Sequence, residues 1–161
     1  MTKVKKPVEV FTDGSLMGQG EDAKGGYGIV MLFGSKIQKY NSSSYRKTAT
    51  IIRMELKALI KALEMIKPGF DIYMYCDSKL IVDTINRRLV EWVEFGSLDS
   101  KKHPELWRRF MRAKRIHIEG GSFVHISWIR SHAGNKYNEM ADKLAQKGVF
   151  SKNKVECKDN N

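Results

Sequence analysis

The sequence predicts a single α/β domain in which three strands precede alternating helices and strands. Three observations favour this class. The first third of the chain carries short β-prone runs, the hydrophobic period changes to three and four residues at position 53, and strand and helix patterns alternate from there on. The 161 residues, 42% of them hydrophobic, suffice for one core and leave no room for a second large domain. The predicted order is βββαβααβα.

The first three strands are expected to be consecutive and antiparallel. Residues Val8 to Thr12 are β-prone and are followed by the turn-forming Asp13-Gly14-Ser15. The segments 27–33 and 36–40 are separated by a Gly-Ser pair, which is typical of a hairpin. Five glycines between positions 18 and 28 predict a loose connection before this hairpin.

A helix is predicted from Arg53, because leucine and isoleucine recur at steps of three and four until Pro68-Gly69 ends the run. The remaining elements are expected at residues 71–76 (strand), 79–94 (helix), 104–114 (helix), 122–129 (strand) and 138–147 (helix). We expect residues 1–150 to form the domain and residues 151–161 to form a polar, disordered tail.

The chain is strongly basic, with 29 Lys+Arg against 18 Asp+Glu and a net charge of +11. A polyanion is therefore the favoured partner, although an anionic membrane surface or a ribosomal location would also explain the charge. No apolar run approaches the roughly 18 residues of a membrane-spanning helix, and no signal peptide is recognisable, so we expect a soluble, cytoplasmic protein. The two cysteines, Cys76 and Cys157, form neither a disulfide framework nor a metal-ligand spacing, so zinc is not expected.

Acidic residues follow two of the predicted strands. A right-handed crossover lays the strand 71–76 parallel to the first strand, so that Asp13 and Asp77 end their strands side by side at the carboxyl edge, where open α/β sheets bind ligands. Taken singly, Asp13 is also explained as a turn residue and Asp77 as a helix N-cap. The pairing of the two carboxylates favours a site.

Two further carboxylates lie on predicted helices. Glu55 is in line with the apolar stripe through Leu59 and Ala62, although a glutamate in the first turn also complements the helix dipole. Asp142 lies on the last helix, where position alone indicates only an exposed acid. Converging carboxylates repel one another, and each raises the pKa of its neighbours. A hard divalent cation such as Mg2+ relieves this repulsion. An acidic metal pocket in a basic protein is typical of a nuclease.

Four sequence motifs occur in a fixed order. They are F-T-D-G-S at 11–15, R-M-E-L at 53–56, Y-C-D-S at 75–78, and W-I-R-S-H-A-G-N at 128–135 with N-E-M-A-D at 138–142. Together they closely resemble ribonuclease H of type 1, the bacterial and phage ribonuclease HI family, over residues 8–148. The resemblance implies a ribonuclease H-like fold: a five-stranded mixed sheet with helices on both faces. It also implies an endonuclease that hydrolyses the RNA strand of RNA/DNA hybrids and leaves 5′-phosphate and 3′-hydroxyl ends.

The resemblance also implies roles for individual residues. Two Mg2+ ions, or Mn2+ in their place, would be held with the scissile phosphate by four catalytic carboxylates: Asp13, Glu55, Asp77 and Asp142. His132 matches a mobile histidine that assists proton transfer or product release, although an ordinary surface histidine is the alternative. Asn138 and Glu139 would lie next to the metals, Glu139 as a carboxylate behind the ligands. Arg53 and Asn138 are assigned to nucleic-acid binding.

Selectivity for RNA in a hybrid must depend on its 2′-hydroxyls. The backbone at Gly14 and Ser15 is expected to approach the RNA strand, with a loose hairpin as the alternative. Between Arg87 and Arg115, nine Lys+Arg accompany four Asp+Glu and two tryptophans, where bacterial relatives carry a basic protrusion. The alternative there is a solvated helical face with core tryptophans. The expected contacts are Arg87, Arg88, Trp92, Lys101 and Lys102.

The chain departs from the family pattern at Ile51-Ile52, where many relatives carry two amide side chains, and at Lys79, where they carry glutamine. The mode of minor-groove recognition is therefore open. A non-catalytic hybrid-binding module would lack a metal carboxylate, whereas all four are present. Another nuclease of this fold, such as an integrase or resolvase, is disfavoured by the R-M-E-L helix and the complete H-A-G loop. We expect a monomer that binds no membrane and needs no obligate protein partner.

Overall fold

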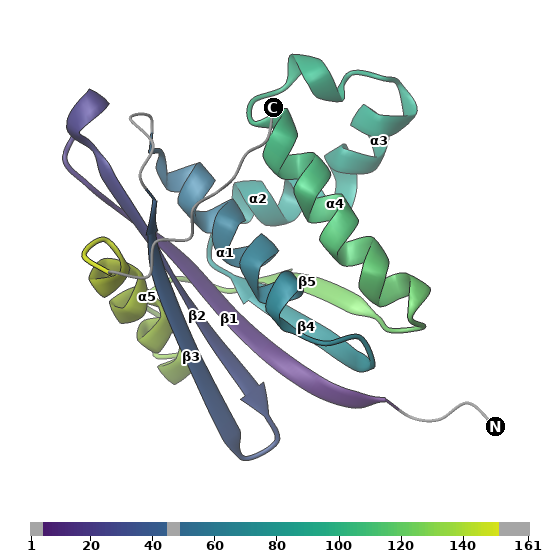
Figure 1. The fold of residues 1–161 in the computed structure, drawn as a ribbon, viewed down its shortest axis with the longest axis horizontal. Helices are drawn as coiled ribbons and strands as arrows, with labels where there is room; N and C mark the ends of the chain where they lie inside the picture. The colour runs from purple at the N-terminus through teal and green to yellow at the C-terminus, as the bar shows by residue number, and fades with distance from the viewer. Residues whose placement is uncertain (1–4, 45–48, 152–161) are drawn as a thin grey trace.

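The computed structural model describes residues 5–44 and 49–151, which form a five-stranded sheet (Figure 1). The strands are β1 (Lys6–Met17), β2 (Lys24–Phe33), β3 (Lys36–Ser44), β4 (Phe70–Cys76) and β5 (Val124–Trp128). Their order across the sheet is β3-β2-β1-β4-β5. The first three strands are antiparallel, while β4 runs parallel to both β1 and β5. The predicted mixed sheet is confirmed.

The helices follow the predicted order. They are α1 (Ile51–Met65), α2 (Lys79–Asp83), α3 (Leu89–Glu94), α4 (Pro104–Glu119) and α5 (Lys136–Gly148). The predicted stretch 79–94 is helical throughout, but a π-helical turn at Thr84–Arg88 separates α2 from α3. Helix α1 begins before Arg53 because the Thr50 side chain accepts a hydrogen bond from the Arg53 backbone. Helix α4 continues past residue 114, since His117 is buried with Nε2 2.7 Å from the Leu63 carbonyl.

Helices cover both faces of the sheet, as expected (Figure 1). Helix α1 packs on β1 and β2, and α4 packs on α1, which encloses the larger hydrophobic cluster. Helix α5 packs alone on the opposite face of β1, β2 and β3, over a smaller cluster of Phe11, Val30 and Ala141. Among the described residues, no helix combines the length and the apolar character needed to cross a membrane.

The prediction that five glycines loosen the chain before the hairpin is wrong for Gly25, Gly26 and Gly28. All three belong to β2. A Cβ on Gly28 would lie 2.5 Å from the carbonyl oxygen of Ala141, and one on Gly26 would lie 2.7 Å from that of Ala145. Gly26 and Gly28 therefore allow α5 to lie directly against β2, whereas Gly25 faces Met54 of α1. Only residues 18–23 form the connection, with Gly18 and Gly20 at positive φ.

Strand β1 continues past Asp13 to Met17, so the expectation that Asp13 ends its strand is wrong. Pairing with β4 stops at Thr12 opposite Cys76, but pairing with β2 continues and places Asp13 opposite Gly28. Asp77, in contrast, directly follows β4 as predicted. Of the expected tail at 151–161, only Ser151 lies within the described residues.

Candidate active site

Asp13 and Asp77 lie at adjacent positions where β1 and β4 stop pairing. Asp13 is buried, and its Oδ1 accepts a hydrogen bond of 2.9 Å from the Gly14 backbone. Burial, with the charges of Asp77 and Glu55, raises the pKa of Asp13 to about 8. Burial, followed by the charge of Asp142, also raises the pKa of Asp77. Burial and the neighbouring carboxylates therefore disfavour the ionised form of both carboxyl groups.

Glu55 reaches the same edge from the first turn of α1. It is buried, and a Cβ on Gly14 would lie 2.8 Å from its Cγ, so only glycine at position 14 allows this approach. Burial, followed by the charge of Asp77, raises the pKa of Glu55 to about 7. The predicted alignment of Glu55 with the apolar stripe of α1 agrees with this burial.

Asp142 reaches the site from α5 on the opposite face. It is half-buried, and the side-chain amide of Gln146 lies 3.3 Å from both of its carboxylate oxygens. Its charge raises the pKa values of Asp77 and Asp13, so it lies close to both. The close packing of α5 on the β2 glycines brings Asp142 to the other carboxylates. Sequence position alone carried no signal for this approach.

These residues fit a divalent cation. Four carboxylates from β1, α1, α5 and the end of β4 converge, and three of them have raised pKa values because of burial and mutual repulsion. The ligand atoms of Glu55, Cys76 and Asp77 all lie within 4.8 Å of one another. A donor set dominated by carboxylate oxygens suits hard cations such as Mg2+ and Mn2+.

His132 lies in the loop before α5, and Asn138 and Glu139 lie in the first turn of that helix. His132 is exposed and adopts a positive φ of 53°, which is uncommon outside glycine, and its charge lowers the pKa of Asp77. Glu139 is exposed in the first turn of α5. Asn138 is buried, and its Oδ1 has no hydrogen-bond partner among the described residues.

The structure does not bring Arg53 to a surface that nucleic acid can contact. Its side chain is 6% exposed, and its Nη1 lies 2.8 Å from Glu105 Oε1 and 3.0 Å from His103 Nδ1. Arg53 therefore ties the first turn of α1 to the start of α4. The sequence did contain a sign of this burial: Arg53 lies three residues before Leu56, and this spacing puts Arg53 on the buried side of α1.

Three of the predicted basic contacts, Arg88, Lys101 and Lys102, line a groove of about 210 Å³, the basic groove. It is lined by Ile52, Leu80, Ile81, Thr84, Arg88, Trp92, Lys101, Lys102, His103 and Trp107. The tryptophans pack edge to face at 6.1 Å, and the Lys101 ammonium lies 5.3 Å above the ring of half-buried Trp92. Two of these lining residues, Ile52 and Leu80, lie three positions along the chain from Glu55 and Asp77, respectively. Arg87 is exposed and pairs with Asp83 at 3.5 Å.

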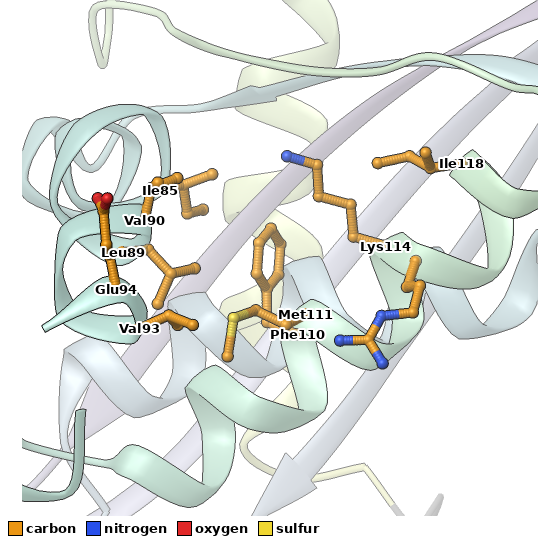
Figure 2. A pocket seen from close by; sticks show the side chains of 10 residues that line it. Ile85, Leu89, Val90, Val93, Glu94, Phe110, Met111, Lys114 and Ile118 are labelled. Carbon is orange, nitrogen blue, oxygen red and sulfur yellow. The ribbon is translucent and has the colours of Figure 1, made fainter. Parts of the chain in front are cut away.

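A second groove, of about 550 Å³, lies between α3 and α4 (Figure 2). Figure 2 shows Val90, Val93 and Met111 on its apolar lining, with Lys114 reaching over it and Glu94 at its rim. It contains none of the predicted site residues, and no pattern in the sequence indicated it.

The family model of RNase H matches residues 5–150. The chain belongs to the ribonuclease H family. It is 35% identical to the ribonuclease H of Rhizobium etli, over 93% of this chain and 97% of that protein. The ribonuclease H of Novosphingobium aromaticivorans is 36% identical, over 91% of this chain and 99% of that one. The resemblance to this family and the expectation of an endoribonuclease are confirmed.

The fold comparison agrees with the sequence comparison. The crystal structure of LC9-RNase H1, described as a type 1 RNase H with the type 2 active-site motif, superposes with a TM-score of 0.76. It is 25% identical to this ribonuclease H, and the match covers 92% of this chain and 75% of that one. The ribonuclease H-like fold predicted from the sequence is confirmed.

Proposed function

We propose that this ribonuclease H hydrolyses the RNA strand of RNA/DNA hybrids by two-metal-ion catalysis. The observation that supports this most strongly is the convergence of Asp13, Glu55, Asp77 and Asp142, with the pKa of Asp13 raised to about 8 and that of Glu55 to about 7. Such a cluster is unfavourable unless positive charge joins it. A chain of net charge +11 also attracts a polyanion, which brings a phosphodiester to the acidic cluster.

The four carboxylates would hold two Mg2+ ions, or Mn2+ in their place. When bound, such ions activate water and neutralise the charge that develops on the leaving oxygen. The water gives up a proton to solvent as its oxygen forms a bond to phosphorus, while the bond from phosphorus to the 3′-oxygen breaks. The 3′-oxygen keeps the electron pair and takes up a proton, which leaves a 3′-hydroxyl and a 5′-phosphate.

His132 is proposed to carry protons between the site and solvent. It is exposed in the loop between β5 and α5, and its charge acts on Asp77. An imidazole ring nitrogen takes up and releases protons near neutral pH, so this position suits protonation of the leaving group or release of the product. Glu139 and Asn138 would orient ligands and water around the metal ions.

The hybrid is proposed to lie across the end of the sheet where β1 and β4 stop pairing, and across the basic groove. Backbone atoms at Gly14 and Ser15 would face the RNA strand, whose 2′-hydroxyls distinguish it from DNA. The cationic contacts to the phosphates would come from Arg87, Arg88, Lys101 and Lys102, with Trp92 beside them. Because Ile52 lines this groove and Ile51 is 43% exposed, the wall next to Glu55 is apolar. Arg53 does not belong to this surface, because it is buried against Glu105.

We further propose that the enzyme acts as a monomer in the cytoplasm, without an obligate protein partner. Cys76, the free cysteine among the described residues, is buried in the core, which suits a reducing compartment.

Cleavage of an end-labelled RNA/DNA hybrid tests the proposed function. We expect cutting of the RNA strand with Mg2+ or Mn2+, none with EDTA, and none of an RNA duplex, a DNA duplex or single-stranded RNA. Asp13→Asn should abolish cutting while retaining the far-ultraviolet circular dichroism of the parent protein. Binding of the hybrid without cutting under any of these metal conditions would instead support a binding module.

The product ends provide a separate test of the reaction. A 5′-phosphate and a 3′-hydroxyl predict that the downstream fragment is ligated without prior phosphorylation and that the upstream fragment is extended by a polymerase. Fragments that need a phosphatase before extension would contradict the proposed bond cleavage.

A further inference from the structure

The thiol of Cys76 lies beside two carboxylates of the acidic cluster. Cys76 is the last residue of β4, is 1% exposed, and has its Sγ 3.9 Å from Oε2 of Glu55. The ligand atoms of Glu55, Cys76 and Asp77 lie within 4.8 Å of one another. The spacing of Cys76 and Cys157 alone indicates no zinc site. The fold instead supplies carboxylates to Cys76 from α1 and from the end of β4.

These distances suit a small tetrahedral ion. With a zinc–sulfur distance of about 2.3 Å and a zinc–oxygen distance of about 2.0 Å, tetrahedral geometry separates sulfur and oxygen by about 3.5 Å. The 3.9 Å between Cys76 and Glu55 is a few tenths of an ångström longer, which a small side-chain rotation closes. Thiolate sulfur selects soft and borderline metals such as Zn2+ and Cd2+, whereas Mg2+ takes oxygen ligands.

A buried hydroxyl group lies on the same face of the sheet as Cys76. Thr12 pairs with Cys76 between β1 and β4, so both side chains project from the same face of the sheet. Gly14, two residues further along β1, lies on that face and contacts Glu55. Thr12 is 1% exposed, and its Oγ1 has no hydrogen-bond partner among the described residues. A buried hydroxyl usually has a partner, so an unpartnered one on this face is a polar group available to a ligand.

We propose that Glu55, Cys76 and Asp77 form an inhibitory site for Zn2+. On binding, a sulfur–zinc bond replaces the S–H bond of Cys76, the thiol proton leaves to solvent, and no electron is transferred. Glu55 and Asp77 also belong to the proposed catalytic set, so zinc in this site denies them to Mg2+. That inhibition rests on the proposed function, whereas the binding of zinc does not.

Cadmium is a spectroscopic probe for this site, because a thiolate bound to Cd2+ absorbs in the ultraviolet by charge transfer. We would titrate metal-free protein carrying Cys157→Ser, so that Cys76 is the remaining cysteine. The expected result is an absorption band that saturates at one equivalent of Cd2+ and is absent when Cys76→Ser is added. Competition with Zn2+ should remove the band. No band at one equivalent would overturn the proposal.

Glu55→Gln in the Cys157→Ser protein tests whether the carboxylate is a ligand. This variant keeps the thiol, so the band should persist while the affinity for Cd2+ falls about tenfold or more. Unchanged affinity would overturn the three-residue site, even if Cys76 binds the metal. Far-ultraviolet circular dichroism of every variant confirms that the comparison is between folded proteins.

Inhibition of hybrid cleavage by Zn2+ provides the functional test. The half-inhibitory Zn2+ concentration, measured in Mg2+, should be about tenfold or more higher in Cys76→Ser/Cys157→Ser than in Cys157→Ser. Equal inhibition of the two proteins would overturn the role of Cys76. If Cys157→Ser cuts no hybrid, the proposed function fails, but the cadmium titration still decides the metal site.

Discussion

A Cβ atom added to Gly14 would lie 2.8 Å from Cγ of Glu55 and 2.7 Å from its backbone nitrogen. Both distances are shorter than the normal van der Waals contact distance of a carbon atom. Strand β1 and the first turn of α1 therefore meet where residue 14 lacks a side chain. The distance between the Asp13 and Glu55 carboxylates depends on this contact.

Gly14→Ala is expected to displace Glu55 and to reduce hybrid cleavage strongly. Because the added methyl group meets backbone atoms, it should also lower the free energy of unfolding by about 1–3 kcal/mol. Gly120→Ala is the matched control, since Gly120 has a φ of −74° and its added Cβ would meet neighbours at an ordinary 3.4 Å. Cleavage rates and urea unfolding of both variants check the prediction. Full activity of Gly14→Ala would show that the contact does not position Glu55.

Without divalent metal, the protein is expected to lose stability as the pH rises from about 4 to 8. In the folded state the pKa is raised to about 8 for Asp13 and to about 7 for Glu55, so the folded state holds protons that the unfolded chain has released. The contribution of these two carboxyl groups to the free energy of unfolding is fully present below their unfolded pKa values near 4. Above that pH the free energy of unfolding falls by up to about 1.4 kcal/mol per pH unit for each such proton. Urea unfolding in EDTA measures this slope.

Asp13→Asn is the control for that pH dependence. It removes one carboxyl group and one charge near Glu55, so at pH 8 it should exceed the parent protein in stability by about 1 kcal/mol or more. Added Mg2+ should stabilise the parent protein at pH 8 more than the variant. A parent protein whose stability rises between pH 5 and pH 8 in EDTA would contradict the raised pKa values.

Glu105→Ala is expected to destabilise the fold, because it leaves the charge of Arg53 buried without its ion-pair partner. The expected loss is about 1.5–3 kcal/mol in the free energy of unfolding. Asp99→Ala is the control, since its pair with Arg108 is exposed and should contribute about 0–1 kcal/mol. Thermal or urea unfolding distinguishes the two. Equal small effects would mean that the Arg53 pair does not hold α1 to α4.

Binding of the hybrid should weaken steeply with added salt, and Arg88→Ala/Lys102→Ala should reduce that dependence. The slope of log K against log salt decreases by about 0.9 for each phosphate that the variant no longer neutralises. Lys36→Ala/Lys39→Ala is the control, because these exposed lysines lie on β3, away from α3 (Figure 1). Measured with Asp13→Asn to prevent cleavage, an equal slope for both double variants would exclude the basic groove as the binding surface.

The sequence was sufficient to predict the order of elements and the convergence of Asp13, Glu55 and Asp77. Hydrophobic period and strand-end position are local signals, and the parallel crossover follows from chain connectivity. Asp142 was different, because its approach depends on how closely α5 packs on β2. That closeness comes from Gly26 and Gly28, whose role appears only when the two elements are in contact.

Other features were invisible in the sequence for the same reason. Arg53 was predicted to contact nucleic acid, but its partner Glu105 lies 52 positions away on α4. Strand β1 was predicted to end at Asp13, because the turn-like Asp-Gly-Ser run hides the continued pairing with β2. Cys76 showed no metal-ligand spacing, because the carboxylate of Glu55 reaches it from another element.

The carboxylates at positions 13, 55, 77 and 142 belong to four segments spread along nearly the whole chain. No fragment that lacks α5 contains the full set, and such a fragment also leaves Phe11 and Val30 without their cover. A chain still emerging from the ribosome therefore carries no complete acidic cluster until residues 136–148, which include Asp142, have been made.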